Sequence, residues 1–473
     1  MSEQPTVSPI LLVADHKWRD LPGMALLKKM LEDHHHQPAV VMSYAGVSAG
    51  LRLFRPRAVA LTTLIGPREQ NLARAARHIG AAVIVIPTEG IPGSKESMAG
   101  IFRNPESWEI CDLYLPWGPV MAEFAVAEGY LPKGKVRLTG TGRFDFYRPP
   151  LSQCLMSRSE LDERLGLRSR APVVTWATTF VLASYAENEK RLRYTEKDLA
   201  ARGLSKIEGF ANLAEIASKE QEAKTLVLAS MRSCCEEFPD VEFLIKPHPY
   251  EEFALYEALV SEARRDGLRN CHLAADVYIW DILQHATVHV HSGSTTGMEA
   301  WLMGIPTINF QPGGYARFKG AVGGAMIEQE DLDDTQTQRE AVASRIRHYV
   351  GGGAIDPELR EQRTRFLNRW FDKFDGHAAE RQAAAIADLL KNYAAPVVSN
   401  RRPPWVGRRA PLTYLHYRVN QLLGRPFDEP LIERGRAAPL DFLGQRDKVV
   451  RQRDVDIWER RIREVLAKSH QAS

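Results

Sequence analysis

The sequence has few cysteines, no long uncharged apolar run and no basic leader, and each absence excludes a class of protein. Its five cysteines are odd in number and unpatterned, which fits a reducing cytoplasm rather than a disulfide-rich secreted scaffold. No run of about 18 uncharged apolar residues occurs, so we expect no membrane-spanning helix. The residues before Ile10 lack a basic start followed by a long apolar stretch. They predict a disordered lead into a first strand rather than a signal peptide.

Patterns that bind nucleic acid or metal are also missing. The sequence contains no zinc-finger spacing, no RNP signature and no helix-turn-helix pattern, so we expect no nucleic acid partner. The run His34–His36 predicts a solvated helix end, because three consecutive side chains on regular structure cannot all face one ion. Two Asp-X-Asp strings begin at Asp331 and Asp454, but neither follows a buried strand. We therefore expect no metal ion, and no cofactor besides a substrate.

Charge is distributed unevenly along the chain. Of its 473 residues, 44% are hydrophobic and 26% are charged, which is typical of a soluble globular protein with two or three domains. The net charge is +3, yet the segment from Arg401 to Ser473 holds 16 Lys or Arg against 9 Asp or Glu. This asymmetry favours an anionic surface, such as the inner face of the cytoplasmic membrane, as a partner of the C-terminal tail. The alternative is a tail that folds back on the body of the protein.

Short apolar runs alternate with helical patterns along most of the chain. The expected strands of the first part are Ile10–Ala14, Ala39–Met42, Ala58–Leu61, Ala82–Pro87 and Val136–Thr139. Those of the second part are Val173–Ala177, Val241–Ile245, Cys271–Leu273, Val288–Val290 and Pro306–Phe310. This alternation predicts an α/β fold with two Rossmann-like, doubly wound units, residues 1–150 and 151–394. A basic extension, residues 395–473, completes the chain.

The stretch Val288–Gln311 carries the first candidate site. A small-residue turn, His291–Gly297, joins a strand to the helix Met298–Met303. A turn of this kind directs free backbone N–H groups and the positive end of the helix dipole at one spot, which favours an anion. The residues of the turn that would bind it are Ser292, Gly293, Ser294 and Thr295. The alternative is that the hydroxyls only cap the helix.

A second candidate is the segment Lys246-Pro247-His248-Pro249 at the end of the strand Val241–Ile245. Proline on both sides fixes the backbone around His248, so its imidazole is held rigidly and can donate a hydrogen bond to phosphate. Lys246 adds a positive charge. The segment could also be a structural turn. Since both motifs follow strands of one expected sheet, both should face one cleft and suit a diphosphate or phosphodiester.

Carboxylates follow two strands of the first unit. Glu89 lies just beyond the strand Ala82–Pro87, next to a glycine, where it could act as a base, as a nucleophile or merely as a loop cap. Arg143 and Asp145 follow a glycine-containing turn after Val136–Thr139. They alternate with Phe144, so both could face the cleft, or they could pair with each other.

These motifs together resemble a known family. "KPHP" followed by "HSGSTTGMEAWLMGIPTINF" resembles the HP and serine motifs of bacterial surface-carbohydrate glycosyltransferases with the GT-B fold, including retaining β-Kdo transferases and other users of CMP-sugars. "IPTEG", "LPWGPVMAEF", "LTGTGRFDFY" and "FDGHAAERQAAAIADLL" resemble further segments of that group, so the resemblance runs from about Ile10 to Leu390. The sequence departs from the pattern at Thr88, where a second acid is expected, and at Gly142, where proline is expected.

The resemblance implies a GT-B fold with a mostly helical C-terminal extension and a role for each motif. His248 and Lys246 would bind the donor phosphate together with the serine turn, and Glu299 would hold ribose hydroxyls. Glu89 and Asp145, with Arg143 beside them, would act at the sugar carbon. A retaining route needs a nucleophile and an acid/base partner, whereas an inverting route needs only a base, and the sequence does not choose between them.

The implied function is the transfer of a Kdo-like or other acidic sugar from a CMP-linked donor. The acceptor would be a surface polysaccharide or a lipid-linked glycan, and the enzyme would be cytoplasmic or peripheral on the inner face of the cytoplasmic membrane. Three alternatives stay open: a CDP-alditol phosphotransferase, a nucleotide-sugar 2-epimerase, and a sugar-nucleotide-binding assembly factor without activity.

Overall fold

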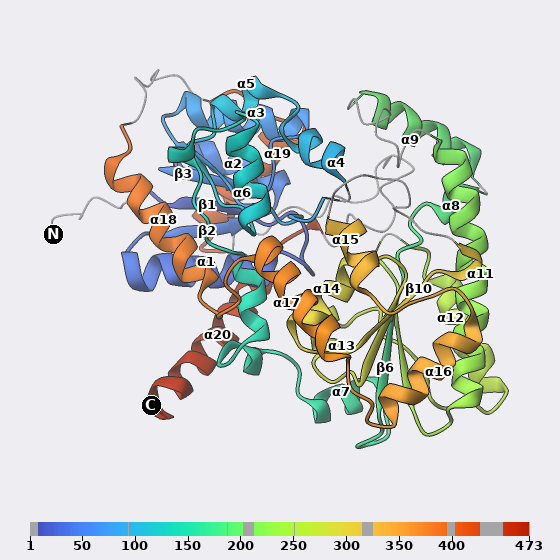
Figure 1. Cartoon of the computed structure of the whole chain (residues 1–473). Helices are drawn as coiled ribbons and strands as arrows, with labels where there is room; N and C mark the ends of the chain where they lie inside the picture. The colour runs from blue at the N-terminus through green and yellow to red at the C-terminus, as the bar shows by residue number, and fades with distance from the viewer. Residues whose placement is uncertain are drawn as a thin grey trace.

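The computed structural model describes residues 8–92, 94–186, 188–201, 212–249, 251–314, 325–394, 403–425 and 448–472. Two α/β halves lie side by side, and the last helices of the chain return to the first half (Figure 1). The expected disordered lead, residues 1–7, lies outside the described residues. Within the described residues, no helix combines the length and apolarity needed to cross a lipid bilayer.

The first half contains a five-stranded parallel sheet with the strand order β2-β1-β3-β4-β5. Its strands are β1 (Ile10–Val13), β2 (Ala39–Met42), β3 (Ala58–Leu61), β4 (Ala82–Val85) and β5 (Leu113–Tyr114). Nearly every residue of these strands is buried, as expected for a sheet covered by helices on both faces.

The second half contains a six-stranded parallel sheet with the order β11-β10-β9-β6-β7-β8. Its strands are β6 (Val173–Ala177), β7 (Glu242–Lys246), β8 (Cys271–Leu273), β9 (Val288–His291), β10 (Thr307–Phe310) and β11 (Thr335–Gln336). The two separate parallel sheets confirm the expected α/β class.

Helices surround both sheets (Figure 1). In the first half they are α1 (Leu21–His35), α2 (Tyr44–Phe54), α3 (Pro67–His78), α4 (Lys95–Phe102), α5 (Pro105–Glu109), α6 (Pro119–Ala127), and the 3-10 helices η1 (Lys133–Lys135), η2 (Gly142–Tyr147) and η3 (Leu151–Cys154). In the second half they are α7 (Arg158–Leu165), α8 (Ala183–Ala186), α9 (Glu189–Ala201), α11 (Leu213–Glu237), α12 (Ala254–Arg265), α13 (Ile279–Leu283), α14 (Thr295–Leu302), η4 (Pro312–Gly314), α15 (Ala325–Leu332) and α16 (Arg339–Val350). The chain continues with α17 (Pro357–Phe371), α18 (Ala378–Asn392), α19 (Ala410–Leu422) and α20 (Gln452–Ala472).

One expected strand is absent. Instead of a strand over Val136–Thr139, only Val136 forms an isolated bridge, with Tyr114 of the two-residue strand β5. Leu138 is 39% exposed, so the segment has no covered place at the sheet edge. The residues after Gly140 therefore do not leave a strand end; they form the 3-10 helix η2.

The C-terminal helices complete the core of the first half. The buried residues of α18 include Ala379, Ala383, Ile386 and Leu390, and those of α20 include Val455, Trp458, Ile462 and Val465. Both sets recur at intervals of three or four residues, so each helix buries one apolar stripe. Both helices pack against α1, and α19 packs against α2. The boundaries at residues 150 and 394 remain predictions, but α18 lies with the first half rather than with the second.

Candidate functional site

The segment after β7 is held by a buried carboxylate. The backbone N–H of His248 donates to Glu251 Oε1 at 3.2 Å, and the N–H of Glu251 donates to the His248 carbonyl at 2.9 Å. Glu251 is 1% exposed. It also accepts hydrogen bonds from Thr178 at 2.7 Å and Tyr256 at 2.5 Å, and Lys224 lies 3.3 Å away. His248 is thus fixed by more than its flanking prolines, through a glutamate that sequence analysis did not single out.

The serine turn after β9 divides into structural and unpartnered groups. The N–H of Gly293, whose φ is 61°, donates to Asn309 Oδ1 at 3.0 Å, and the N–H of Ser294 donates to His291 Nδ1 at 3.2 Å. The Ser294 hydroxyl caps α14 by accepting from the N–H of Thr296 at 3.3 Å. For Gly293 and Ser294, the expected anion-binding amides are therefore already used inside the protein.

Ser292 and Thr295 differ from these two residues. Ser292 is 4% exposed, and within the described residues its hydroxyl has no hydrogen-bond partner. Thr295 is exposed and supplies the first N–H of α14, which has no acceptor inside the helix. A buried hydroxyl without a partner is unfavourable unless a ligand completes it. These two residues are the groups of the turn that an anion would meet.

Two buried histidines support the turn from below. His289 bridges the hydroxyls of Thr175 and Thr296, at 2.8 and 2.9 Å, and burial holds its pKa well below the ordinary value, so its ring is neutral. Nε2 of His291 lies 3.1 Å from the carboxylate of Asp333. The sequence signal for these two residues is a histidine at every second position of a buried strand.

The strand order brings the two motifs together. In the register of the sheet, Ala177 at the end of β6 pairs with Lys246 on one side and with His291 on the other. Adjacent strands are about 4.8 Å apart, so the backbones of β7 and β9 are separated by roughly 10 Å. Between them, the hydroxyl of Thr179 donates to the Ser292 carbonyl at 2.9 Å. His248 and the serine turn therefore lie at one sheet edge and can share a ligand. Lys246 points elsewhere: its Nζ donates to the Ala275 carbonyl at 2.7 Å.

Glu89 faces this edge from the first half. Its side chain is 80% exposed and forms an ion pair with Arg19. Arg19 also binds Asp20 at 2.6 Å and Thr88 at 3.2 Å. The guanidinium of Arg19 lowers the pKa of Glu89, and the imidazole of His248 contributes in the same direction. The carboxylate is therefore ionised at neutral pH, and it lies within electrostatic range of His248.

Close packing against Trp117 explains why the residue next to Glu89 is a glycine, Gly90. A side chain at Gly90 would meet the ring of Trp117 at 2.3 Å. Trp117 in turn donates from Nε1 to the Pro87 carbonyl at 2.6 Å. The tryptophan therefore holds the loop that presents Glu89, which connects two of the segments noted in the sequence.

Asp145 is buried against the start of α18. Both of its carboxylate oxygens accept backbone N–H groups at the start of α18, from Ala378 at 3.0 Å and Ala379 at 2.8 Å. Asp145 is 4% exposed, and burial raises its pKa to about 7. Asp145 thus has a structural role at the start of α18, and its expected catalytic role remains a prediction.

Arg143 and Glu299 pair with each other across the two halves. Glu299 is 4% exposed, and its two oxygens bind Arg143 and Tyr147. This ion pair joins η2 to α14, and the roles expected for its residues, catalysis for Arg143 and ribose binding for Glu299, remain predictions. The expected common face of Arg143 and Asp145 is not formed, because η2 is a 3-10 helix, in which residues 143 and 145 do not share a face as they would in a strand.

Metal-binding geometry is not found in the part of the chain that the structure describes. No group of three or more His, Cys, Asp or Glu side chains there is arranged to hold a metal ion. The charges available to a bound anion are instead the imidazole of His248 and the positive end of α14.

No model of a known protein family matches the chain, and no curated protein sequence matches it. Solved structures do match its fold. A UDP-N-acetylglucosamine 2-epimerase superposes with a TM-score of 0.51 at 12% identity, over 85% of this chain and 99% of that chain. The Neisseria meningitidis UDP-GlcNAc 2-epimerase bound to UDP-GlcNAc gives 0.50 at 11% identity, over 81% and 100%.

The wall teichoic acid polymerase TagF gives a TM-score of 0.52 at 12% identity, over 81% of this chain and 89% of that chain. Identities this low establish the fold and nothing finer. They agree with the two facing parallel sheets and the helical C-terminal segments described above. The chain has the GT-B fold.

Proposed function

We propose that this protein is a glycosyltransferase that moves a sugar from a CMP-linked donor to a surface glycan or a lipid-linked glycan. The observation that carries the proposal is the shared sheet edge, where His248 and Ser292 follow the two strands flanking β6 and Glu89 faces them. Among the described residues the Ser292 hydroxyl has no partner. The structural neighbours named above act on UDP-GlcNAc or polymerise teichoic acid, which agrees with a nucleotide-linked substrate. The CMP base and a Kdo-like sugar rest on the sequence motifs.

In this proposal the second half binds the donor and the first half provides the base. His248, the Ser292 hydroxyl and the first N–H of α14 hold the donor phosphate and stabilise the charge that develops on it. The acceptor hydroxyl attacks the anomeric carbon, the bond from that carbon to the phosphate oxygen breaks, and Glu89 takes the hydroxyl proton. Arg19 keeps Glu89 ionised and ready to accept it. These groups neutralise the phosphate without a metal ion or another cofactor.

Donor binding is tested by thermal unfolding with CMP, CDP, UDP and GDP. A nucleotide at 100 times its dissociation constant adds about 2.7 kcal/mol of stability. We expect CMP to give the largest shift, and His248→Ala and Ser292→Ala to reduce it. His285→Ala, which alters a half-buried histidine away from this edge, is the control. A CMP shift unchanged by His248→Ala would remove the phosphate site from the proposal.

Product analysis separates the alternatives. A phosphodiester product would identify a CDP-alditol phosphotransferase, and conversion of the free nucleotide sugar without acceptor would identify a 2-epimerase. If glycan output in cells needs His248 but not Glu89, the protein is a non-catalytic assembly factor. A glycosidic product formed only with acceptor present supports the transferase.

We further propose that the protein works on the cytoplasmic face of the membrane, and that α19 makes the contact. The exposed residues Leu412, Leu415, Val419 and Leu422 recur at intervals of three and four, so they form one apolar stripe, and Leu422 is 79% exposed. Residues 403–425 contain four arginines and no Asp or Glu. An exposed apolar stripe bordered by cations fits an anionic lipid surface. In contrast, α20 packs on the body and is not a free tail.

Vesicle co-sedimentation tests this contact. Wild-type protein should pellet with vesicles that contain phosphatidylglycerol and much less with neutral phosphatidylcholine vesicles. Leu415→Glu with Leu422→Glu should abolish pelleting, whereas Leu226→Glu, at a 47% exposed leucine of α11 in the second half, should not. Concentration-dependent dimerisation without vesicle binding would instead assign the stripe to a second copy of the chain.

A further inference from the structure

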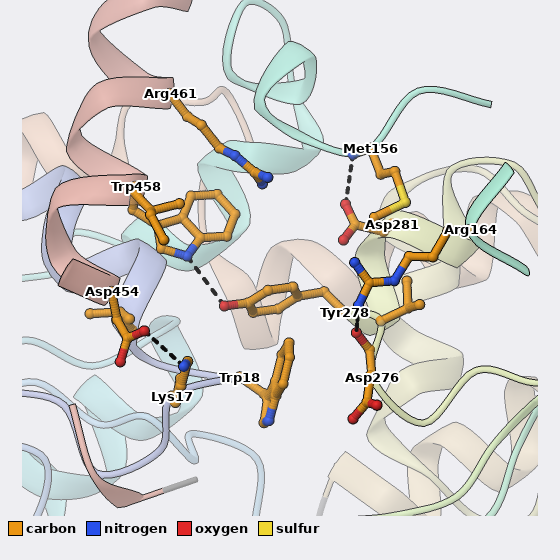
Figure 2. Close-up of a pocket in the computed structure, with 13 residues that line it drawn as sticks. Lys17, Trp18, Met156, Arg164, Asp276, Tyr278, Asp281, Asp454, Trp458 and Arg461 are labelled. Atoms are coloured by element: carbon orange, nitrogen blue, oxygen red, sulfur yellow. Dashed lines mark hydrogen bonds and ion pairs between the residues drawn. The ribbon is translucent and has the colours of Figure 1, made fainter. Parts of the chain in front are cut away.

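A pocket of about 190 Å³ opens where the two halves meet α20 (Figure 2). Its walls come from the loop between β1 and α1, from the second half, and from α20. The residues that line it are Lys17, Trp18, Leu21, Met156, Arg164, Asp276, Val277, Tyr278, Asp281, Asp454, Ile457, Trp458 and Arg461. None of them belongs to the phosphate site described above.

Aromatic rings form one side of the pocket. The rings of Trp18 and Tyr278 are 4.6 Å apart at 65°, and those of Tyr278 and Trp458 are 5.4 Å apart at 90°. Nε1 of Trp458 donates to the Tyr278 hydroxyl at 3.2 Å, as drawn in Figure 2. One ring comes from each half and one from α20, so their mutual packing fixes the shape of the pocket. Trp18 and Tyr278 are only partly buried and can offer surface to a ligand.

The polar groups of the pocket balance in charge. Three cations, Lys17, Arg164 and Arg461, face three carboxylates, Asp276, Asp281 and Asp454. Lys17 and Asp454 already pair at 2.8 Å. This balance disfavours a phosphate group, which needs an excess of positive charge. Hydroxyl groups suit it, because a hydroxyl can donate to a carboxylate and accept from a guanidinium at once.

Asp281 and Asp276 are held in different ways, the first through its carboxylate and the second through its backbone carbonyl. Oδ1 of Asp281 accepts the N–H of Met156 at 2.7 Å, and burial raises the pKa of Asp281 to about 6. The carbonyl of Asp276 accepts from Arg164 at 2.8 Å. Asp276 and Arg164 are exposed, and Figure 2 shows them side by side at one end of the pocket.

The pocket adjoins the candidate reaction centre. Trp18 directly precedes Arg19, which holds Glu89. On the facing wall, Asp276 directly follows Ala275, whose carbonyl anchors Lys246 of the motif that carries His248. The same two loops thus serve both sites.

We propose that this pocket binds one pyranose ring of the glycan acceptor. The apolar C–H face of a sugar would pack on Trp18 and Tyr278, and its hydroxyls would meet Asp276 and the two arginines. The volume supports a single ring, since pockets for drug-sized ligands begin near roughly 300 Å³. This inference rests on the proposed transferase function, because it names that enzyme's acceptor site.

Saturation-transfer NMR with methyl pyranosides tests the pocket directly. The probes are the methyl glycosides of glucose, galactose, N-acetylglucosamine and rhamnose, added singly to the full chain. At least one should bind to the wild type, about tenfold more weakly to Trp18→Leu and severalfold more weakly to Arg461→Gln. Arg460→Gln, at the neighbouring exposed arginine outside the pocket, is the matched control and should bind as the wild type does.

The nucleotide shift separates the two proposals. Two results would overturn the pocket assignment while the donor site stands. The first is that CMP stabilises the wild type but no glycoside binds. The second is that Trp18→Leu and Arg461→Gln bind glycosides as well as Arg460→Gln does. If glycoside binding weakens in both variants while their CMP shifts match the wild type, the acceptor assignment is supported. Arg461→Gln changes an exposed side chain, so it remains informative if Trp18→Leu does not fold.

Discussion

The sheet of each half has an edge that carries candidate site residues, here called the first edge and the second edge after their halves. The two edges hold these residues by different means. At the second edge, His248 and the serine turn directly follow parallel strands, and buried groups such as Glu251 and His289 fix them from below. At the first edge, Glu89 is an exposed side chain held by one arginine and by a loop packed on Trp117. If the proposed function is correct, the donor side of the site is held by buried groups and the side that supplies the base by exposed ones.

The sharpest test of this contrast is Glu89→Gln. Loss of a general base lowers a reaction rate by about 10²- to 10⁴-fold. Because the side chain is 80% exposed, we expect the unfolding temperature and the CMP shift to stay unchanged. Sugar transfer and thermal unfolding are measured on the same samples, with Glu123→Gln, at an exposed residue of α6, as the control. An unaltered rate would show that the first edge does not supply the base.

The next largest effect concerns the ion pair between Arg143 and Glu299, which joins the two halves. Arg143→Met leaves the buried Glu299 carboxylate uncompensated, and breaking a buried pair typically lowers the free energy of unfolding by about 3–5 kcal/mol. Urea unfolding measures this loss of stability. The double variant Arg143→Met with Glu299→Leu should recover much of the lost free energy. If Glu299→Gln leaves stability unchanged but weakens CMP binding more than tenfold, Glu299 holds the ribose after all.

Gly297→Ala probes the packing under the serine turn. An added Cβ would lie 2.3 Å from His291 and 2.4 Å from Gln329. Overpacking of this kind typically lowers the free energy of unfolding by about 1–3 kcal/mol, and here it should also weaken CMP binding. Gly134→Ala, where a Cβ meets nothing within 4 Å, should do neither. Equal behaviour of the two variants would show that the turn is not rigid.

The last prediction concerns the pH dependence that Asp145 gives to stability. The pKa of Asp145 is raised to about 7 in the fold, so the folded chain binds more protons than the unfolded chain between the ordinary pKa of 3.8 and about 7. Stability should therefore fall as the pH rises through this window. Urea midpoints of Asp145→Asn should lack this part of the slope. If the wild type and the variant keep parallel pH profiles, Asp145 does not titrate there.

Much of the arrangement was predictable because it follows from strand ends. Parallel strands share one carboxyl edge, so the positions of His248, the serine turn and Glu89 could be inferred from apolar runs alone. The partners of Glu299 and Asp145 could not. They depend on a 3-10 helix, which changes which residues share a face, and on α18, which lies more than 200 residues away in sequence. Ser292 and Ser294 are both turn serines, and what distinguishes them is that the Ser294 hydroxyl caps α14, whereas that of Ser292 has no hydrogen-bond partner among the described residues.

The return of α18 and α20 to the first sheet has a consequence for biosynthesis. The first half contains residues 10–114 in its sheet, yet its core closes only with residues near 380–390 and 455–465. A nascent chain cannot complete the core of this half when its strands leave the ribosome, because residues of α20 belong to that core. Loss of α20 would therefore expose apolar surface in a half whose strands are encoded more than 300 residues earlier.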